Sequence, residues 1–189
     1  MARVLHSEWF RRLDAAEVRF CRVCNRAGDR RPLLAVFRAA SRLGDGVIWY
    51  ALMLALPLVA GRAGLTLAVM MLGTAMAGTL LYWWLKNRLV RRRPFVSYRR
   101  VIRPGTRPLD EFSFPSGHTL HAASFTTLAL LHMPVLGLAL LPFAAAVAAS
   151  RVVLGLHYPS DVVAGGALGI ALALLASQIA IQVGALPLI

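Results

Sequence analysis

The sequence predicts an all-α fold: an integral membrane helical bundle of about five transmembrane helices, preceded by an amphipathic helix. Of the 189 residues, 58% are hydrophobic and 15% are charged, which is too apolar for a typical soluble protein. The apolar residues gather in long runs, separated by short polar segments rich in arginine, glycine and proline. These runs divide the chain into an N-terminal arm, residues 1–45, and a transmembrane domain, residues 46–189.

The N-terminal arm carries ten arginines and five acidic residues, yet its apolar residues repeat at helical spacing. They form one stripe, made of Trp9, Leu13, Ala16, Phe20 and Val23. A helix with this stripe either lies on the membrane surface or packs on the bundle, and the pattern fits both placements. The arm lacks the apolar core and cleavage site of a signal peptide, so we expect the internal runs to drive insertion.

The two cysteines, Cys21 and Cys24, also fall in this arm. In a helix they point the same way but rarely reach disulfide geometry. A zinc site would need two further ligands, and no other pair of cysteines or histidines has suitable spacing. We therefore interpret both as small apolar residues.

The transmembrane domain contains four apolar runs: residues 47–60, 65–85, 119–150 and 162–183. The first is shorter than the roughly 20 residues of a perpendicular crossing, so it is expected to extend into its flanks. A tight turn is expected at residues 61–64. The third run would be about 48 Å long as one helix, which exceeds the hydrocarbon core, so it must fold back near Pro134 and Gly137. Five crossings result.

Three polar segments follow or precede these crossings: residues 86–94, 115–118 and 150–161. Because successive crossings alternate in direction, all three segments emerge on the same side of the membrane. The polar side chains able to do chemistry are therefore predicted to meet at one rim of an otherwise apolar bundle.

The residues in these segments form a three-part pattern: K-x6-R-P from Lys86 to Pro94, P-S-G-H from Pro115 to His118, and S-R-x5-H-x3-D from Ser150 to Asp161. In this order and spacing, the pattern resembles the signature of the type 2 phosphatidic acid phosphatase (PAP2) superfamily, which includes lipid phosphatases and vanadium haloperoxidases. The resemblance covers about residues 40 to 183 and leaves the N-terminal arm without a matching motif.

A phosphoryl group in transfer spreads negative charge over its oxygens, so its site needs fixed cations and N–H donors. Lys86, Arg93 and Arg151 are the expected cations, and Lys86 is the only lysine beside twenty arginines. Ser116 and Gly117 stand where a helix should begin, so their backbone N–H groups are expected to face the anion. The Ser116 hydroxyl either caps this helix or holds a phosphate oxygen.

His157 is the expected nucleophile, giving a phosphohistidine intermediate. Asp161 is expected to accept the other imidazole N–H and to fix the tautomer. His118 is then the general acid that protonates the leaving oxygen and later activates water. His121 either lines the pocket or serves packing, and His132, at the far hairpin, is expected to be inert.

No cofactor and no metal are expected. Only Asp110 and Glu111 add carboxylates near the three segments, too few for a magnesium cage. The family resemblance likewise implies a metal-free reaction.

The expected substrate is a phosphorylated lipid, whose headgroup enters from water while its chain stays in the membrane. Small members of the family resemble undecaprenyl pyrophosphate phosphatases. The polyprenyl pyrophosphate is slightly favoured, because the arginine-rich loop is able to hold a second phosphate. The alternatives are phosphatidic acid and phosphatidylglycerophosphate. Residues of that loop are Arg88, Arg91, Arg92, Arg99, Arg100, Arg103 and Arg107.

The net charge of +13 accords with an anionic substrate or membrane surface. Nucleic acid is not an expected partner, because such binders have a polar, foldable surface. A non-catalytic membrane transport subunit is a competing class, but the runs lack the polar groups of a transport path. Vanadium haloperoxidases are soluble, unlike this chain.

We expect the protein in a bacterial inner membrane. Of its 21 basic residues, only Arg62 falls on the face opposite the three segments. The positive-inside rule therefore places the arm and the site in the cytoplasm, whereas the family resemblance favours a periplasmic site. Because of this charge distribution, we predict that the arm and the site lie on the cytoplasmic side.

Overall fold

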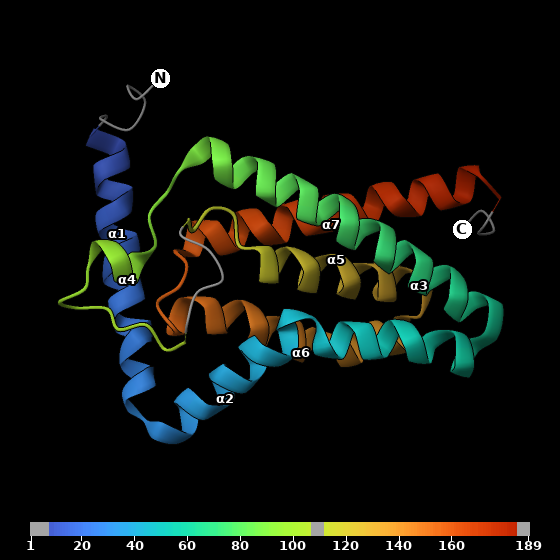
Figure 1. Ribbon diagram of the computed structural model, residues 1–189, viewed down its shortest axis with the longest axis horizontal. Helices are drawn as coiled ribbons and strands as arrows, with labels where there is room; N and C mark the ends of the chain where they lie inside the picture. The colour runs from blue at the N-terminus through green and yellow to red at the C-terminus, as the bar shows by residue number, and fades with distance from the viewer. Residues whose placement is uncertain (1–7, 107–111, 185–189) are drawn as a thin grey trace.

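The computed structural model describes residues 8–106 and 112–184, and helices make up all the regular elements in these two ranges (Figure 1). The helices are α1 (Glu8–Asn25), η2 (Arg26–Asp29), α2 (Arg31–Arg42), η3 (Leu43–Val47), α3 (Ile48–Leu89), α4 (Pro94–Ser97), α5 (Gly117–His132), α6 (Pro134–Val153) and α7 (Pro159–Gln182). A single isolated bridge joins Arg92 to Phe112. The predicted all-α class is therefore confirmed.

Helix α3 consists of two arms that fold back on each other at Gly61 (Figure 1). Gly61 has φ 55° and ψ −130°, a conformation that side chains strongly disfavour. Gly64 follows, where an added Cβ would overlap the carbonyl of Leu56. Both glycines are needed for the reversal, and the turn expected at residues 61–64 is confirmed.

The long third run also reverses, as predicted. Helix α5 ends at His132, Met133 follows, and Pro134 is the first residue of α6. Pro134 suits this place because its fixed φ is helical and its missing N–H would have no partner there. Gly137, expected in the turn, lies inside α6 instead. Its lack of a side chain lets α6 close onto Leu130 of α5.

Helix α5 lies at the centre of the bundle, packed against α3, α6 and α7. It has 16 residues, so it is about 24 Å long and falls short of the hydrocarbon core. Three helical stretches within the described ranges are long and apolar enough to span a membrane: residues 31–89, Pro134–Val153 and Pro159–Gln182. The count of five crossings stays a prediction.

Close contact between α5 and α7 depends on glycine. Gly165 and Gly169 of α7 face α5, where an added Cβ would overlap the carbonyl oxygens of Ser116 and Leu120. Small residues allow helix backbones to approach in this way. The seam brings the start of α5 beside the start of α7, and both ends carry residues of the three-part pattern.

The N-terminal arm packs on the bundle through a face that the sequence did not single out. Helix α1 contacts α6 and α7 at one end of the bundle (Figure 1), and buried Glu17 and Cys21 lie on this contact face. Phe20 and Val23, from the predicted apolar stripe, are exposed. The side chains of Trp9 and Leu13 lie outside the described residues. The boundary at residue 45 stays a prediction.

Candidate active site

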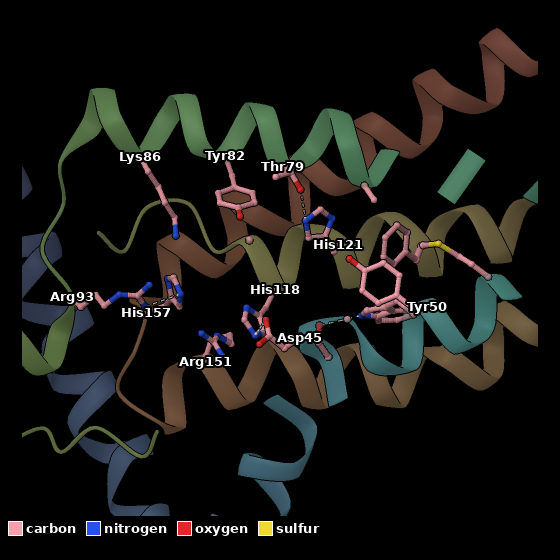
Figure 2. A pocket seen from close by; sticks show the side chains of 17 residues that line it. Asp45, Tyr50, Thr79, Tyr82, Lys86, Arg93, His118, His121, Arg151 and His157 are labelled. Atoms are coloured by element: carbon pink, nitrogen blue, oxygen red, sulfur yellow. Dashed lines mark hydrogen bonds and ion pairs between the residues drawn. The ribbon is translucent and has the colours of Figure 1, made fainter. Parts of the chain in front are cut away.

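The three polar segments converge on one cavity of about 230 Å³ (Figure 2). Six of the predicted site residues line it: Lys86, Arg93, Gly117, His118, Arg151 and His157. The deeper wall is apolar, with Trp49, Met53 and Phe125. The cavity therefore joins a charged end to an apolar end.

His157 lies in the short connection between α6 and α7 and is almost fully buried. Its Nε2 accepts a hydrogen bond from Arg93 Nη1 at 3.2 Å, and its Nδ1 lies 3.6 Å from Asp161 Oδ2. This pattern assigns the proton to Nδ1 and leaves the lone pair on Nε2. Burial, reinforced by Arg151, Arg93 and Lys86, lowers the pKa of His157 well below its ordinary value. The imidazole is therefore neutral at neutral pH.

Three buried cations surround this imidazole. Arg93 Nη1 also donates to the carbonyl oxygen of Leu156 at 3.0 Å, and Arg151 Nη1 donates to Ser41 Oγ at 2.6 Å. The Lys86 ammonium sits 5.1 Å from the centroid of the Tyr82 ring. Burying several cations together is costly unless an anion joins them. Asp45 is the single acidic residue in the described lining, so the cavity suits an anionic ligand.

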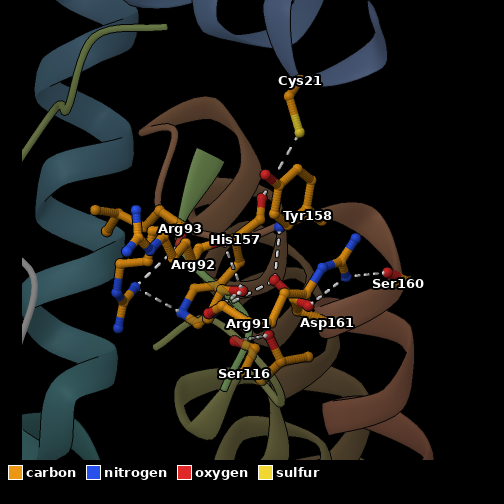
Figure 3. A network of polar contacts seen from close by, with 12 residues as sticks. Cys21, Arg91, Arg92, Arg93, Ser116, His157, Tyr158, Ser160 and Asp161 are labelled. Carbon is orange, nitrogen blue, oxygen red and sulfur yellow. Dashed lines mark hydrogen bonds and ion pairs between the residues drawn. The ribbon is translucent and has the colours of Figure 1, made fainter. Parts of the chain in front are cut away.

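Asp161 lies behind His157 rather than in the cavity wall (Figure 3). It is fully buried in the first turn of α7. Oδ2 accepts the Tyr158 N–H at 2.8 Å, and Oδ1 accepts from Arg91 Nη1 at 2.7 Å. The 3.6 Å separation from His157 Nδ1 is longer than a good hydrogen bond. At this distance Asp161 acts on the imidazole through its charge and close contact and not through a hydrogen bond, and it does not line the cavity.

Arg91 does not lie where the sequence predicts. The sequence predicts that it holds a second phosphate together with the other loop arginines. Its guanidinium instead pairs with Asp161 and with Glu17 Oε2 of α1, the latter at 2.6 Å. These contacts were not foreseen, because Glu17 belongs to the arm that carries no motif.

Ser116 is also placed differently. It precedes α5, but its hydroxyl shares a 3.0 Å hydrogen bond with Thr119 Oγ1, and its N–H donates to the carbonyl oxygen of Asp161 at 3.0 Å. The residue is fully buried and does not line the cavity. The expectation that its N–H faces the anion is therefore wrong, because this N–H donates to Asp161 at the contact between α5 and α7. Gly117 does line the cavity.

His118 Nε2 lies 3.2 Å from Asp45 Oδ1, a partner that the sequence did not indicate (Figure 2). Asp45 sits in η3, where Gly46 has φ 127° and interrupts the helix. His121 lines the cavity and lies 3.4 Å from Thr79 Oγ1, so its pocket alternative holds. His132 bonds Ser177 at 3.0 Å and is not in the lining.

The described residues contain no group of three His, Cys, Asp or Glu side chains that could hold a metal ion. Asp110 and Glu111 lie outside the described ranges. Both cysteines are free thiols. Burial and the carboxylate of Glu17 raise the pKa of Cys21 to about 12, so this thiol is unreactive.

Comparison with protein families matches residues 63–183, more than half of the chain, to the PAP2 superfamily. The chain belongs to the PAP2 superfamily. It is 37% identical over 144 residues to the decaprenylphosphoryl-5-phosphoribose phosphatase of Mycobacterium tuberculosis, in strains CDC 1551 / Oshkosh and ATCC 25618 / H37Rv. The match covers 75% of this chain and 77% of each relative.

Two solved structures share the PAP2 fold. One is the transmembrane PAP2 type phosphatidylglycerolphosphate phosphatase from Bacillus subtilis, with a TM-score of 0.71 and 25% identity over 95% of this chain and 90% of that one. The other is LpxE from Aquifex aeolicus, with a TM-score of 0.71 and 26% identity over 85% of this chain and 93% of that one. The PAP2 chain described here is an integral membrane phosphatase, which rules out the transport-subunit alternative.

Proposed function

We propose that this PAP2 phosphatase removes a phosphate group from a polyprenyl-linked lipid through a phosphohistidine on His157. The observation that carries the proposal is the state of its imidazole. Nε2 is unprotonated and hydrogen-bonded to Arg93 beside the cavity, while Nδ1 faces Asp161. A neutral imidazole among cations suits in-line attack on phosphorus, provided that Arg93 turns its donor from Nε2 to a phosphoryl oxygen when the substrate enters.

In the first step, His157 Nε2 attacks phosphorus and the bond from phosphorus to the ester oxygen of the headgroup breaks. The imidazolium form of His118 gives its proton to the departing oxygen. Burial and the Arg151 charge lower the pKa of His118, so this form depends on the negative charge of the bound phosphate. Lys86, Arg93 and Arg151 hold the phosphoryl oxygens, and the Gly117 N–H is a further donor. In the second step, His118 takes a proton from water, whose oxygen attacks phosphorus. The nitrogen–phosphorus bond breaks and inorganic phosphate leaves.

Two observations favour a phosphomonoester over the pyrophosphate that the loop arginines had favoured. The mycobacterial relative is named for a phosphoribose carried on decaprenyl phosphate. Arg91, one of the arginines expected at a second phosphate, is engaged by two carboxylates. The apolar end of the cavity, at Trp49 and Phe125, suits a hydrocarbon chain next to the headgroup.

The substrate class is tested by turnover of the purified enzyme on three lipids in the same detergent. These are a polyprenyl phosphate bearing phosphoribose, a polyprenyl pyrophosphate and a phosphatidate. We expect the highest kcat/KM for the first. A strong preference for phosphatidate would reject the polyprenyl assignment and leave the phosphatase assignment intact.

The lowered pKa of His157 predicts how activity responds to acid. A histidine whose pKa is depressed stays neutral until the pH falls to that lower value, so the attacking form persists below pH 6.5. The acid limb of kcat/KM reports the free enzyme, and we expect it to lie below pH 6.5. A pH profile of kcat/KM measures this. A limb at or above the ordinary histidine value would contradict the proposed state of the nucleophile.

We propose that the site and the arm face the cytoplasm from a bacterial inner membrane. Arg62 is exposed and follows Gly61 in the chain. The turn between the two arms of α3 lies at the other end of the bundle from α1 (Figure 1). In intact cells, an impermeant thiol reagent should label a cysteine at Arg62 and spare one at exposed Asp29 until the cells are opened. Cys24 is first replaced by serine, and buried Cys21 stays. The reverse labelling would place the site outside.

A further inference from the structure

One face of α1 contacts the chain segment that carries His157. The face consists of Glu17, Cys21 and Asn25, at four-residue intervals that align side chains on a helix. Glu17 Oε1 accepts the Ser160 N–H at 2.7 Å, and Asn25 Nδ2 donates to the carbonyl oxygen of Val153 at 2.9 Å. Between them, Cys21 Sγ lies 3.8 Å from the carbonyl oxygen of His157 (Figure 3). The arm therefore contacts both sides of the His157 connection.

Glu17 is a buried acid whose charge is directed at Arg91. Its side chain is 7% exposed, and Oε2 lies 2.6 Å from Arg91 Nη2. The other terminal nitrogen of Arg91 lies 2.7 Å from Asp161 Oδ1. One guanidinium thus joins a carboxylate of the first helix to a carboxylate of the last. The planar, rigid fork of arginine suits such a double contact, which lysine cannot reproduce.

Two further contacts fix the orientation of Arg91. Nη1 donates to Ser160 Oγ at 2.7 Å, and the guanidinium lies 3.9 Å from the centroid of the Tyr158 ring. Tyr158 and Ser160 flank the start of α7, directly before Asp161. Glu17 contacts this same turn through the Ser160 N–H. Arg91 and the first turn of α7 are therefore held by one acid of α1.

The contacts of Arg91 affect the imidazole of His157 through Asp161. A carboxylate orients a histidine only when it is ionised and fixed in place, and burial disfavours the ionised form. Arg91 supplies the compensating charge. A free arginine side chain samples many rotamers, so a partner that immobilises it also immobilises the carboxylate it binds.

We propose that Glu17 is a positioning residue for the hydrolysis: acting through Arg91, it holds Asp161 and thereby the imidazole of His157, so that α1 is part of the catalytic machinery. The inference rests on the proposed function, in which His157 attacks phosphorus. Glu17 does not line the cavity, so it is not placed to contact the substrate. Its loss should therefore act on the rate of the chemical step and leave substrate binding unchanged.

The test uses the full-length enzyme with Glu17→Gln and Glu17→Ala. We expect kcat to fall roughly tenfold for Glu17→Gln and by about 10- to 100-fold for Glu17→Ala, by analogy with the loss of an outer partner of a metal-bound histidine. KM should stay at the wild-type value for both. Asp29→Asn is the matched control, because Asp29 is an exposed acid of the same arm and should keep both constants. A raised KM with unchanged kcat would overturn the proposal.

A double-mutant cycle separates positioning from a general loss of stability. If Glu17 acts through Arg91, then adding Glu17→Ala to Arg91→Met should lower kcat little further. Equal losses in the two backgrounds would overturn the inference. Glu17→Gln is nearly isosteric, and its thermal unfolding should match that of the wild type, so a lowered kcat there reports positioning. A lowered unfolding temperature that accounts for the lost activity would count against it.

Different results would overturn the proposed function and the role of Glu17. If His157→Ala retains wild-type phosphate release, the proposed function is wrong and the role of Glu17 falls with it. If His157→Ala is inactive while Glu17→Ala keeps the wild-type kcat, only the positioning role is overturned.

Discussion

Replacing His157 with alanine is expected to lower kcat for phosphate release by at least about 10³-fold, because it removes the atom that bonds to phosphorus. The remaining cations still bind the substrate, so KM should change far less. The measurement is release of inorganic phosphate from a lipid phosphate in detergent with EDTA present. The wild type should keep its activity under these conditions, because the proposed steps use only the side-chain cations and imidazoles that line the cavity.

The covalent intermediate gives a second readout of the same substitution. A substrate labelled on its phosphate should leave label on the acid-sensitive, alkali-stable nitrogen of the wild-type protein, and none on His157→Ala. His132→Ala is the matched control, because His132 is bonded to Ser177 and lies outside the cavity. Label that persists on His157→Ala would assign the attack to another residue.

Replacing His118 with alanine is expected to lower kcat/KM on a lipid phosphate, which reports the first step, by about 10²- to 10⁴-fold, the usual contribution of a general acid. A lipid alkoxide is a poor leaving group and needs the proton. With p-nitrophenyl phosphate, whose departing oxygen needs no proton, the loss should be much smaller. The ratio of the two losses, measured on one enzyme preparation, therefore reports protonation of the leaving oxygen.

His121 supplies the control for this comparison, because its ring lines the same cavity one turn further along α5. Any loss in His121→Ala should be similar for the two leaving groups. Equal losses of kcat/KM for both leaving groups in His118→Ala would contradict protonation of the leaving oxygen by His118.

The convergence of Lys86, His118 and His157 was predictable from sequence because it follows from the order of the crossings. Runs of apolar residues fix where the chain must turn, and alternate turns place their flanking segments on one side. The residue types in those segments then limit the chemistry, since cations and imidazoles together suit phosphoryl transfer. Neither step needs any knowledge of packing detail.

The partners of these residues were not predictable, because they depend on how distant helices pack. Glu17 and Arg91 are 74 residues apart, and Arg91 is indistinguishable by sequence from the other loop arginines. Asp45 belongs to the arm and reaches His118 only through the break at Gly46. The Ser116 N–H is taken by Asp161 because Gly165 lets α7 come close. Such pairings require the three-dimensional arrangement.

The network around Arg91 has a consequence for biosynthesis. Its two acids come from α1 and α7, so Glu17 is synthesised long before Asp161 leaves the ribosome. Until the C-terminal helix has inserted and docked, neither Asp161 nor the imidazole of His157 has its final surroundings. A translation product that stops before α7 lacks Asp161, so we expect it to be unable to remove phosphate from the lipids around it.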